Sequence, residues 1–412
     1  MQRSKLPSNS QYVIVTFSQP MLWYQTDEET WMMNPNRRYL INAARIPSVH
    51  DYIETLSEFD CAALHNKLTA GRNISSAKIL VERFRERGIG DLLFLTGPLS
   101  FLHHVSGGSV KIDLYAYSDR GVVLANSPLL NNRTVLCGPV EYDHLRFYNY
   151  QWFVGSGTEC DEEQDQLNVY DALYKQLGFD PETIEPQWKK PTATLVADDF
   201  LHLDAVFKSI YDQRKIDLRR MGYYVVAPFA NATMRNMKYS TWLEIIKELS
   251  QRRPTLVVGN SKLRLSDTDI SAGQFQQHVS AIGGGVINAI DATPLRVLMA
   301  LIARSTCVFA LDSAPLYIAQ ALKVPAISMW GSHDPGVRIG YDKDYMDLAV
   351  WNETACNHAP CFAYSEFPAQ KCPRGAQQAL CEVLMSVDAK VVLSKLETVE
   401  TKRGVLGAFK AK

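Results

Sequence analysis

The fold of this chain is decided by residues 308–340, which read VFALDSAPLYIAQALKVPAISMWGSHDPGVRIG. The stretch opens within an apolar run typical of a buried strand, and Asp312 stands where a helix is predicted to begin. Pro315 fits the first turn of that helix, because this turn has no use for the missing N–H. Residues 326–330 predict the next strand, and the Gly, Asp and Pro that follow predict a loop. We therefore predict one βαβ unit with a ligand site at its first turn.

Short strand-like runs alternate with helical patterns through much of the remaining chain. A first series opens with a strand at residues 78–82 and a helix at residues 92–104. A second series opens with a strand at residues 223–227 and a helix at residues 241–249, where Thr241 and Glu244 predict a capping box. Repeated βα units predict parallel sheets covered by helices on both faces. We therefore predict an α/β chain with two Rossmann-like domains facing each other across a cleft.

A length of 412 residues is compatible with two hydrophobic cores. We place the boundary between the two domains near residue 215. Before the first domain, residues 11–19 predict a strand and residues 50–68 predict a helix. The prediction comprises an N-terminal extension packing on the first domain (residues 1–75), a first Rossmann-like domain (76–215), a second Rossmann-like domain (216–385) and a mobile tail (386–412).

Composition excludes several classes of protein. The chain is 46% hydrophobic and 21% charged, and its 43 basic and 44 acidic residues give a net charge of -1. No global basic field is available to attract nucleic acid or an anionic membrane. No apolar run approaches the roughly 20 residues that a transmembrane helix needs, and residues 12–17 are too short for a signal sequence. We therefore expect a cytoplasmic protein with no transmembrane segment and no nucleic-acid footprint.

Four of the eight cysteines lie close together near the C-terminus. Cys356, Cys361, Cys372 and Cys381 fall within 26 residues, together with His358. Their spacing is wider than that of the C-x2-C pairs in zinc ribbons. Buried structural thiols, a pair able to cross-link and a zinc site are the alternatives, and we predict no metal.

The first predicted domain carries a glycine-rich turn between its first strand and its first helix. Gly88 and Gly90 would let the backbone of this turn move and pass close to a ligand. Asp91 follows them, at the predicted start of the helix. Its carboxylate is either an N-cap or a base that takes a proton from an incoming hydroxyl group.

Two loops of the second predicted domain offer groups that suit a sugar nucleotide. Thr233, Arg235 and Lys238 precede a helix and form a plausible diphosphate cradle, with a solvated surface loop as the alternative. Asp312 is either an N-cap or an acceptor of hydrogen bonds from sugar hydroxyl groups. The remaining predicted donor-binding and loop residues are Ser313, Ala314 and Pro315 at the turn, with Gly331 and Asp334 in a flexible loop at the same sheet edge.

Four motifs resemble those of glycosyltransferase family 9, the lipopolysaccharide heptosyltransferases. The resemblance spans residues 77–385, and the motifs occur in the family's order. They are GIGDLLFLTGP at residues 88–98, NATMRNMK at residues 231–238, LDSAPLYIAQAL at residues 311–322 and GSHDPGVRIGY at residues 331–341.

This resemblance implies a glycosyltransferase B fold and an enzyme that inverts the anomeric centre without a metal. By the same resemblance Asp91 is the general base, Thr233 and Lys238 contact the diphosphate, and Asp312 is a sugar-binding acid. This chain has Ala314 and Tyr317 where the family often has Gly and His, so the diphosphate side of that turn is expected to differ. The acidic residue that usually binds the nucleotide ribose is not evident in residues 260–267.

We therefore expect a glycosyltransferase that uses a nucleotide-diphosphate sugar, with ADP-heptose as the family default, and needs no cofactor. The acceptor would be a lipopolysaccharide core, another glycan or an unrelated hydroxyl-bearing molecule such as a modified nucleobase. Two other functions stay open. One is a nucleotide-sugar epimerase or hydrolase of the same fold, and the other is a degenerate protein that binds a sugar nucleotide without turnover.

Overall fold

The computed structural model describes the chain in two compact units. Unit 1 comprises Met1–Thr158 with Tyr170–Trp188, and unit 2 comprises Glu159–Val169 with Lys189–Lys412. The predicted boundary near residue 215 is therefore wrong, because α6 (Ala197–Arg214) belongs to unit 2. The described residues are 12–26, 29–42, 50–58, 77–83, 88–116, 119–137, 141–145, 147–154, 167–260, 268–361, 372–374 and 380–410.

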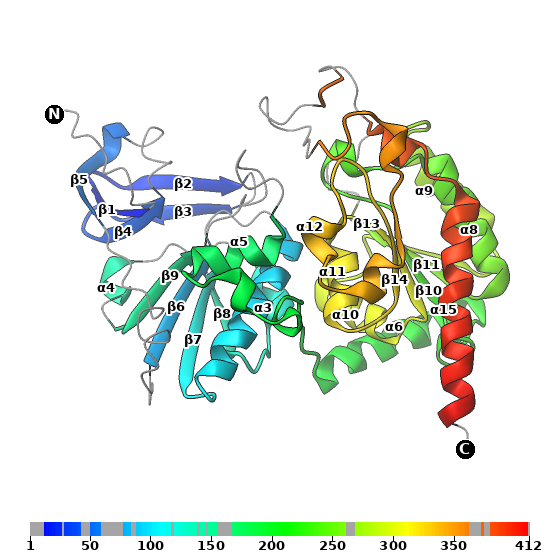
Figure 1. The fold of residues 1–412 in the computed structure, drawn as a ribbon, viewed down its shortest axis with the longest axis horizontal. Coiled ribbons are helices and arrows are strands. Elements are labelled where there is room, and N and C mark those ends of the chain that lie inside the picture. The colour runs from blue at the N-terminus through cyan, green and yellow to red at the C-terminus, as the bar shows by residue number, and fades with distance from the viewer. Residues whose placement is uncertain are drawn as a thin grey trace. The chain divides into compact units, whose positions relative to one another are not determined.

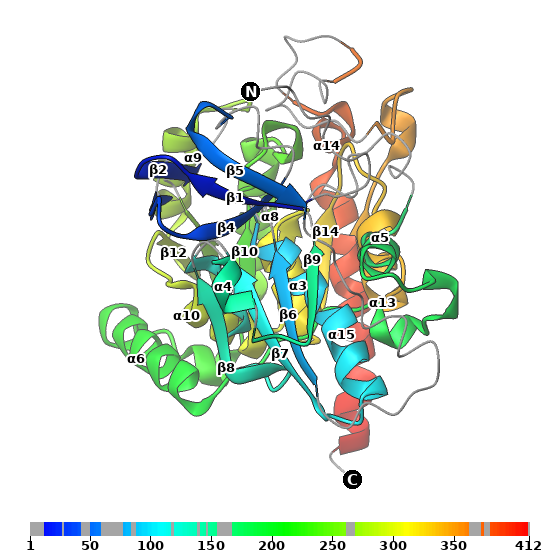
Figure 2. The ribbon, with the colours of Figure 1, turned by 90° about the vertical axis from the view of Figure 1, so that its left-hand side faces the viewer.

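Unit 1 contains a four-stranded parallel sheet with the strand order β8-β7-β6-β9 (Figure 2). The order reverses direction between β6 and β9, which are the first and last of these strands along the chain. The helix α3 follows β6 and contacts β7 with a side lined by buried leucines. The bounds are β6 (Ala77–Arg83), α3 (Ile89–Val105), β7 (Val110–Ala116), β8 (Leu130–Cys137), α4 (Tyr142–Leu145), β9 (Tyr150–Val154) and α5 (Val169–Gln176).

The N-terminal segment forms strands rather than the helix predicted at residues 50–68. β5 (Ile53–Glu58) pairs antiparallel with β1 (Tyr12–Phe17), and β4 (Arg38–Asn42) pairs with the other edge of β1. Ile53 and Thr55 are β-branched, and the open edge of β1 offers them a partner that the local pattern does not show. Residues 59–68 of the predicted helix lie outside the described residues. β2 (Met21–Thr26) and β3 (Glu29–Met33) form a separate hairpin.

These strands are joined to the parallel sheet through the segment around α4. Tyr39 forms an antiparallel bridge with Glu141, and Arg37 places Nη1 2.5 Å from the Glu141 carboxylate. Arg38 and Asp143 form a second exposed ion pair, at 2.6 Å. Exposed pairs of this kind contribute little to stability, so their main effect is to fix the position of β4 within unit 1.

Unit 2 is built on a six-stranded parallel sheet with the order β12-β11-β10-β13-β14-β15. This is the strand order of a doubly wound nucleotide-binding fold, in which the order reverses between the first and fourth strands. The first strand here is β10 and the fourth is β13, and they pair in register from Tyr224↔Cys307 to Ala227↔Ala310. The strands are β10 (Tyr224–Ala227), β11 (Thr255–Gly259), β12 (Val286–Ile290), β13 (Cys307–Leu311), β14 (Ala326–Met329) and β15 (Ala349–Val350).

Helices cover both faces of this sheet (Figure 1). On one face α8 packs against α9 and α15, and on the other α11 packs against α10, which also contacts α6. Asp199 of α6 accepts two hydrogen bonds from Arg296 of α10, one of them 2.9 Å long, and so ties these two helices together. The helices not yet bounded are α7 (Leu218–Met221), α8 (Tyr239–Arg252), α9 (Ala272–Ile282), α10 (Leu295–Arg304), α11 (Ala314–Ala321), α12 (Gly336–Ile339), α13 (Lys343–Met346), α14 (Glu382–Met385) and α15 (Ala389–Lys410).

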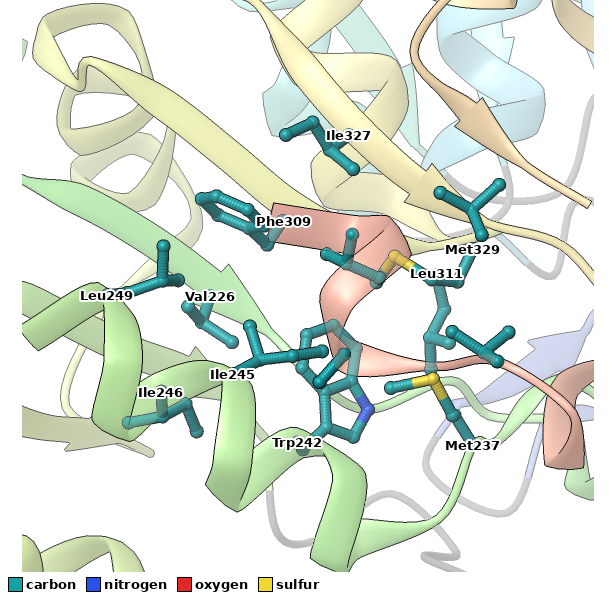
Figure 3. Close-up of a cluster of buried hydrophobic side chains, with 14 of the residues drawn as sticks. Val226, Met237, Trp242, Ile245, Ile246, Leu249, Phe309, Leu311, Ile327 and Met329 are labelled. Atoms are coloured by element: carbon teal, nitrogen blue, oxygen red, sulfur yellow. The ribbon is translucent and has the colours of Figure 1, made fainter. Parts of the chain in front are cut away.

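The core of unit 2 lies between the sheet and α8. Trp242 of α8 is fully buried, and alternate residues of the strands face it, such as Phe309 and Leu311 of β13 (Figure 3). Val392, Leu396 and Val399 of α15 belong to the same cluster. The predicted mobile tail is therefore wrong for residues 389–399, because this part of α15 buries its apolar side chains against the core. Among the described residues, no helix is long and apolar enough to span a membrane.

The helix α9, in the polar segment after β11, was not predicted from the sequence. Its start carries a capping box between Ser271 and Gln274. The Ser-x-x-Gln pattern was present in the sequence, but the helix has only two fully buried apolar residues, Phe275 and Val279. Ala272 and Ile282 also pack against the core at helical spacing from these two, so the sequence carried both the start signal and the apolar period of a helix that was not predicted.

Phe275 is also part of an aromatic cluster that holds the start of α8. Its ring stacks on Tyr239 at a centroid distance of 4.8 Å, and Phe229 packs edge-on against both rings. Gly259, at the end of β11 with a φ of 155°, leaves the space that the Phe229 ring fills. A Cβ atom at this position would lie 2.3 Å from Cδ2 of Phe229.

We expect Gly259→Ala to lower the free energy of unfolding of unit 2 by about 1–3 kcal/mol, because the Phe229 ring must move and the backbone is strained. Gly273→Ala is the control, since a Cβ there meets nothing within 4 Å and the residue lies in α9. That change should be neutral or stabilising by about 0.5 kcal/mol. Urea unfolding of both variants measures the difference. Equal effects would contradict the close approach at Gly259.

Candidate active site

The candidate site of unit 2 lies where its strand order reverses. β10 and β13 are neighbours, and the segments after their carboxyl ends carry Arg235 and Asp312. Open parallel sheets bind ligands at this position. The connections after the two strands run to opposite faces of the sheet and leave a crevice between them. The two loops predicted to bind the donor are therefore brought together, with Nη1 of Arg235 donating to the backbone oxygen of Asp312 at 3.4 Å.

Asp312 is the most deeply buried acidic residue of this edge, with 3% of its surface exposed. The hydroxyl group of Tyr317 donates a hydrogen bond to Oδ1. Oδ2 lies 3.5 Å from Nε of Arg235 and 3.7 Å from Nε of Arg338. These partners come from three separate segments of unit 2, so the carboxylate is the centre of a buried network.

This network keeps Asp312 ionised. Burial alone would raise its pKa, but the guanidinium groups of Arg235 and Arg338, with His333 and the Tyr317 hydroxyl group, lower it to about 2. Burial and the adjacent carboxylate raise the pKa of Tyr317 well above its ordinary value. Tyr317 is therefore the proton donor of the pair at neutral pH.

The turn after Asp312 starts α11 without a side-chain cap. Ser313 has the extended conformation of an N-cap residue, but its Oγ donates to the backbone oxygen of Leu311 at 3.3 Å. The N-cap alternative for Asp312 is wrong, because its carboxylate contacts Tyr317 and two arginines instead. Ser313, Ala314 and Pro315 are half-buried, and Pro315 lies in the first turn as predicted.

The loop after β10 is shaped by Asn236, a residue that the sequence analysis did not single out. Its side chain is fully buried and bonds three backbone groups, accepting from Ala230 N at 3.1 Å and donating to the oxygens of Ala230 and Ala232. The loop then makes one 3-10 turn, Thr233–Arg235. Asn residues often close loops in this way, but no local pattern distinguishes such an Asn from a solvated one.

The start of α8 differs from the prediction. The helix begins at Tyr239 with the half-buried Lys238 as its N-cap, so the predicted capping box at Thr241 is wrong. The cap comes from Asp269, which accepts from Tyr239 N at 2.8 Å and from Ser240 N at 3.3 Å. Thr268 also accepts from Tyr239 N, at 3.0 Å. The helix start that was predicted to cradle a diphosphate is thus occupied by a carboxylate of the chain itself.

The loop after β14 is held by contacts on both sides. Gly331 is buried, and a Cβ there would lie 2.8 Å from Leu384 and 3.1 Å from the backbone oxygen of Met234. Asp334 Oδ1 accepts from Gly336 N at 2.7 Å. Asn168 Nδ2 donates to Gly336 O at 2.8 Å. Gly331 therefore permits close packing, and Arg338 follows in α12 with its side chain 4% exposed.

The predicted base of unit 1 lies at the corresponding position of its own sheet. Asp91 is half-buried in the first turn of α3, directly after β6, where the strand order of unit 1 reverses. Gly88 precedes the helix with an extended backbone, and Gly90 lies inside the helix. A Cβ on Gly88 would lie 3.2 Å from Asp91 Oδ2, so the glycine leaves room for this carboxylate.

The C-terminal cysteines are free thiols in the described part of the chain. Burial raises the pKa of the Cys381 thiol to about 11, so it is protonated at neutral pH. Cys361 N donates to Ser332 O at 3.0 Å, which joins this region to the loop after β14. Among the described residues, no group of three His, Cys, Asp or Glu side chains could hold a metal ion.

Residues 190–367 match the model of glycosyltransferase family 9 (heptosyltransferase). The matched segment is less than half of the chain, and it is similar to the family 9 glycosyltransferases. It contains three of the four motifs, at residues 231–238, 311–322 and 331–341, so it supports the resemblance there and the expectation of a glycosyltransferase. Arg235, Lys238 and Asp312 lie inside the matched segment, whereas Asp91 lies before it. A comparison with curated protein sequences finds no match.

Solved structures share the fold of the matched segment and of the part of the chain before it. A glycosyl transferase family 9 protein from Veillonella parvula DSM 2008 has a TM-score of 0.56 at 10% identity, covering 80% of this chain and 99% of that chain. The E. coli ADP-heptose LPS heptosyltransferase II has a TM-score of 0.52 at 14% identity, covering 79% and 99%. These values confirm the α/β glycosyltransferase B fold.

A third structure covers more of the chain. The iron-containing dodecameric glycosyltransferase TibC from enterotoxigenic E. coli H10407 has a TM-score of 0.52 at 13% identity, covering 96% of this chain and 93% of that chain. TibC has also been solved in complex with ADP-D-β-D-heptose, with a TM-score of 0.53 at 11% identity. At these identities the likeness is one of fold.

We expect Asp269→Asn to lower the free energy of unfolding of unit 2 by at most about 1 kcal/mol at pH 7, because Asp269 is exposed and solvent screens its charge. Burial would raise the pKa of Asp269, but hydrogen bonds from Ser240 and Thr268 lower it. A carboxyl group with a lowered pKa stabilises the fold above its unfolded pKa of about 3.9 and loses this effect as the pH falls below it. The two proteins should therefore differ at pH 7 and pH 5 and converge near pH 3.

Urea unfolding at these three pH values measures the effect. Asp198→Asn is the control, because Asp198 is an exposed acid in the first turn of α6. Its substitution should leave stability nearly unchanged. A difference between wild type and Asp269→Asn that persists at pH 3 would show that the carboxylate does not act as the cap.

Proposed function

We propose that this chain is an inverting glycosyltransferase that moves a sugar from a nucleotide-diphosphate donor to an acceptor hydroxyl group without a metal. The main support is the hydrogen bond that brings Arg235 to the turn before α11, inside the segment that matches the family 9 model. A guanidinium group beside a helix start without a side-chain cap suits a diphosphate, because both supply N–H donors and positive charge.

The donor is proposed to be ADP-heptose or a close analogue. This choice is supported by TibC, a protein of similar fold that was solved with ADP-D-β-D-heptose bound. In this chain Arg235 and the turn Ser313–Pro315 would hold the diphosphate, together with Thr233 and Lys238 from the same loop as Arg235. The acceptor is proposed to be a glycan or another molecule with a free hydroxyl group.

The proposed reaction is a single displacement. Asp91 takes the proton of the acceptor hydroxyl group, whose oxygen attacks the anomeric carbon as the bond to the diphosphate breaks. Attack from the face opposite the leaving group inverts the anomeric centre. Arg235 and Lys238 stabilise the negative charge that develops on the departing nucleoside diphosphate, in the role that a metal has in other transferases.

Product analysis separates this function from the two alternatives. A transferase gives a glycosylated acceptor together with the free nucleoside diphosphate. An epimerase or hydrolase converts the sugar nucleotide in the absence of any acceptor, and a degenerate binding protein binds the sugar nucleotide without turnover. A thermal-shift screen of ADP-, UDP-, GDP- and dTDP-sugars, followed by mass spectrometry of the products, distinguishes the three.

We expect Asp91→Asn to lower turnover by roughly 10²–10⁴-fold while donor affinity stays nearly unchanged, because the amide keeps the shape of the side chain but cannot take a proton. Asp180→Asn is the control, since Asp180 is an exposed acid of unit 1 that caps a 3-10 turn. Turnover is measured by product mass spectrometry and affinity by calorimetry. Wild-type turnover in Asp91→Asn would remove the proposed base.

We expect EDTA to leave turnover unchanged, because Arg235 and Lys238 supply the positive charge that the leaving group needs. Turnover is compared before and after dialysis against the chelator. Loss of activity that magnesium or manganese restores would contradict a metal-independent reaction. Loss that neither ion restores would instead indicate a structural metal at the C-terminal cysteines.

A further inference from the structure

The carboxylate of Asp312 offers no free surface to a ligand. Tyr317 donates to Oδ1. Oδ2 is buried and accepts no hydrogen bond among the described residues, but it forms ion pairs with the Nε atoms of Arg235 and Arg338, at 3.5 Å and 3.7 Å. A sugar hydroxyl group could reach either oxygen only by displacing one of these buried side chains. The contacts of Asp312 therefore disfavour the direct sugar-binding role that the sequence predicts.

The three partners of Asp312 come from three segments of the sheet edge. Arg235 follows β10, Tyr317 lies in α11 after β13, and Arg338 lies in α12 after β14. These strands are neighbours in the parallel sheet. The two Nε atoms lie within about 7 Å of each other, since both approach the same oxygen. Two like charges this close would repel without the carboxylate between them.

The exposure of the side chains identifies the member that can reach a ligand. The side chain of Arg235 is 16% exposed, whereas those of Arg338 and Asp312 are each 4% exposed. Arg235 is also held next to α11 by its hydrogen bond to Asp312 O. The Arg235 guanidinium group is thus the more exposed member of the network and lies beside the turn that starts α11, whereas the Asp312 carboxylate is buried.

We propose that Asp312 is a positioning residue, which holds Arg235 in place to bind the donor diphosphate and makes no contact with the sugar. This inference rests on the proposed function, from which it takes the nucleotide-diphosphate donor. The two ion pairs fix Arg235 and Arg338, and the hydrogen bond from Tyr317 fixes the carboxylate. The group recognised is the diphosphate, which free ADP and ADP-heptose share and which AMP lacks.

The test compares three ligands by calorimetry: ADP-heptose, ADP and AMP. In Asp312→Asn the loss of the ion pairs should lower the affinities for ADP and ADP-heptose by the same factor, about tenfold. The affinity for AMP should fall by clearly less. Tyr317→Phe removes one contact of the carboxylate. It should lower the affinities for ADP and ADP-heptose by a smaller factor, which is again equal for the two ligands. Asp199→Asn is the control, because Asp199 is a buried carboxylate paired with an arginine far along the chain from these loops. It should change stability but none of the three affinities.

Each outcome decides the inference. A loss confined to ADP-heptose would overturn it and restore the sugar-binding role, while the proposed function would stand. Equal losses for all three ligands would reduce Asp312 to a general structural residue and also overturn it. If Asp312→Asn does not fold, Tyr317→Phe decides by the same ratios. A wild-type chain that binds none of ADP, UDP, GDP and dTDP would overturn the proposed function together with the inference.

Discussion

The pairing of β10 with β13 is the constraint on which the candidate site depends. The six strands form two groups of three, β10 to β12 and β13 to β15, because the chain returns from the outer strand β12 to pair β13 with β10. The loops that follow these two strands must then lie side by side, although some 80 residues separate Arg235 from Asp312. Asn236 inside the first loop and the Phe229 ring against Gly259 fix the shape of that loop, so the Arg235 guanidinium group reaches the turn at Asp312.

The starts of α8 and α11, both at this sheet edge, differ in the group that balances their partial positive charge. The first N–H groups of any helix lack partners within the helix and carry partial positive charge. Asp269 satisfies these groups in α8, so an external anion would have to displace a carboxylate that is already bound. In α11 the Ser313 side chain turns to Leu311 instead, and a guanidinium group stands beside the helix. This asymmetry favours α11 as the diphosphate site and leaves Lys238 as a cation beside a helix start that is already capped.

Periodicity was sufficient to predict β13, α11 and β14, because these elements bury most of their residues and their apolar runs are unbroken. It was not sufficient where a partner distant in sequence decides the structure. The cap of α8 is Asp269, thirty residues after the helix start, and the strand β5 depends on the edge of β1. The candidate site likewise combines residues that local pattern indicates with a contact that depends on a distant partner. The sequence located Arg235 and Asp312, but only the folded chain shows that Arg338 shares the Asp312 carboxylate, since no local spacing relates α12 to the loop after β10.

Both units present the same topological feature, and the proposed chemistry is divided between them. The strand order reverses between β6 and β9 in unit 1 and between β10 and β13 in unit 2, and Asp91 and Asp312 each follow a strand at such a point. Asp91 is held by α3 and the core of unit 1, whereas the Asp312 network is held by loops of unit 2. In the proposed reaction, proton transfer and donor affinity would therefore depend on different hydrophobic cores. A substitution that loosens the sheet edge of one unit can change one of these properties without changing the other.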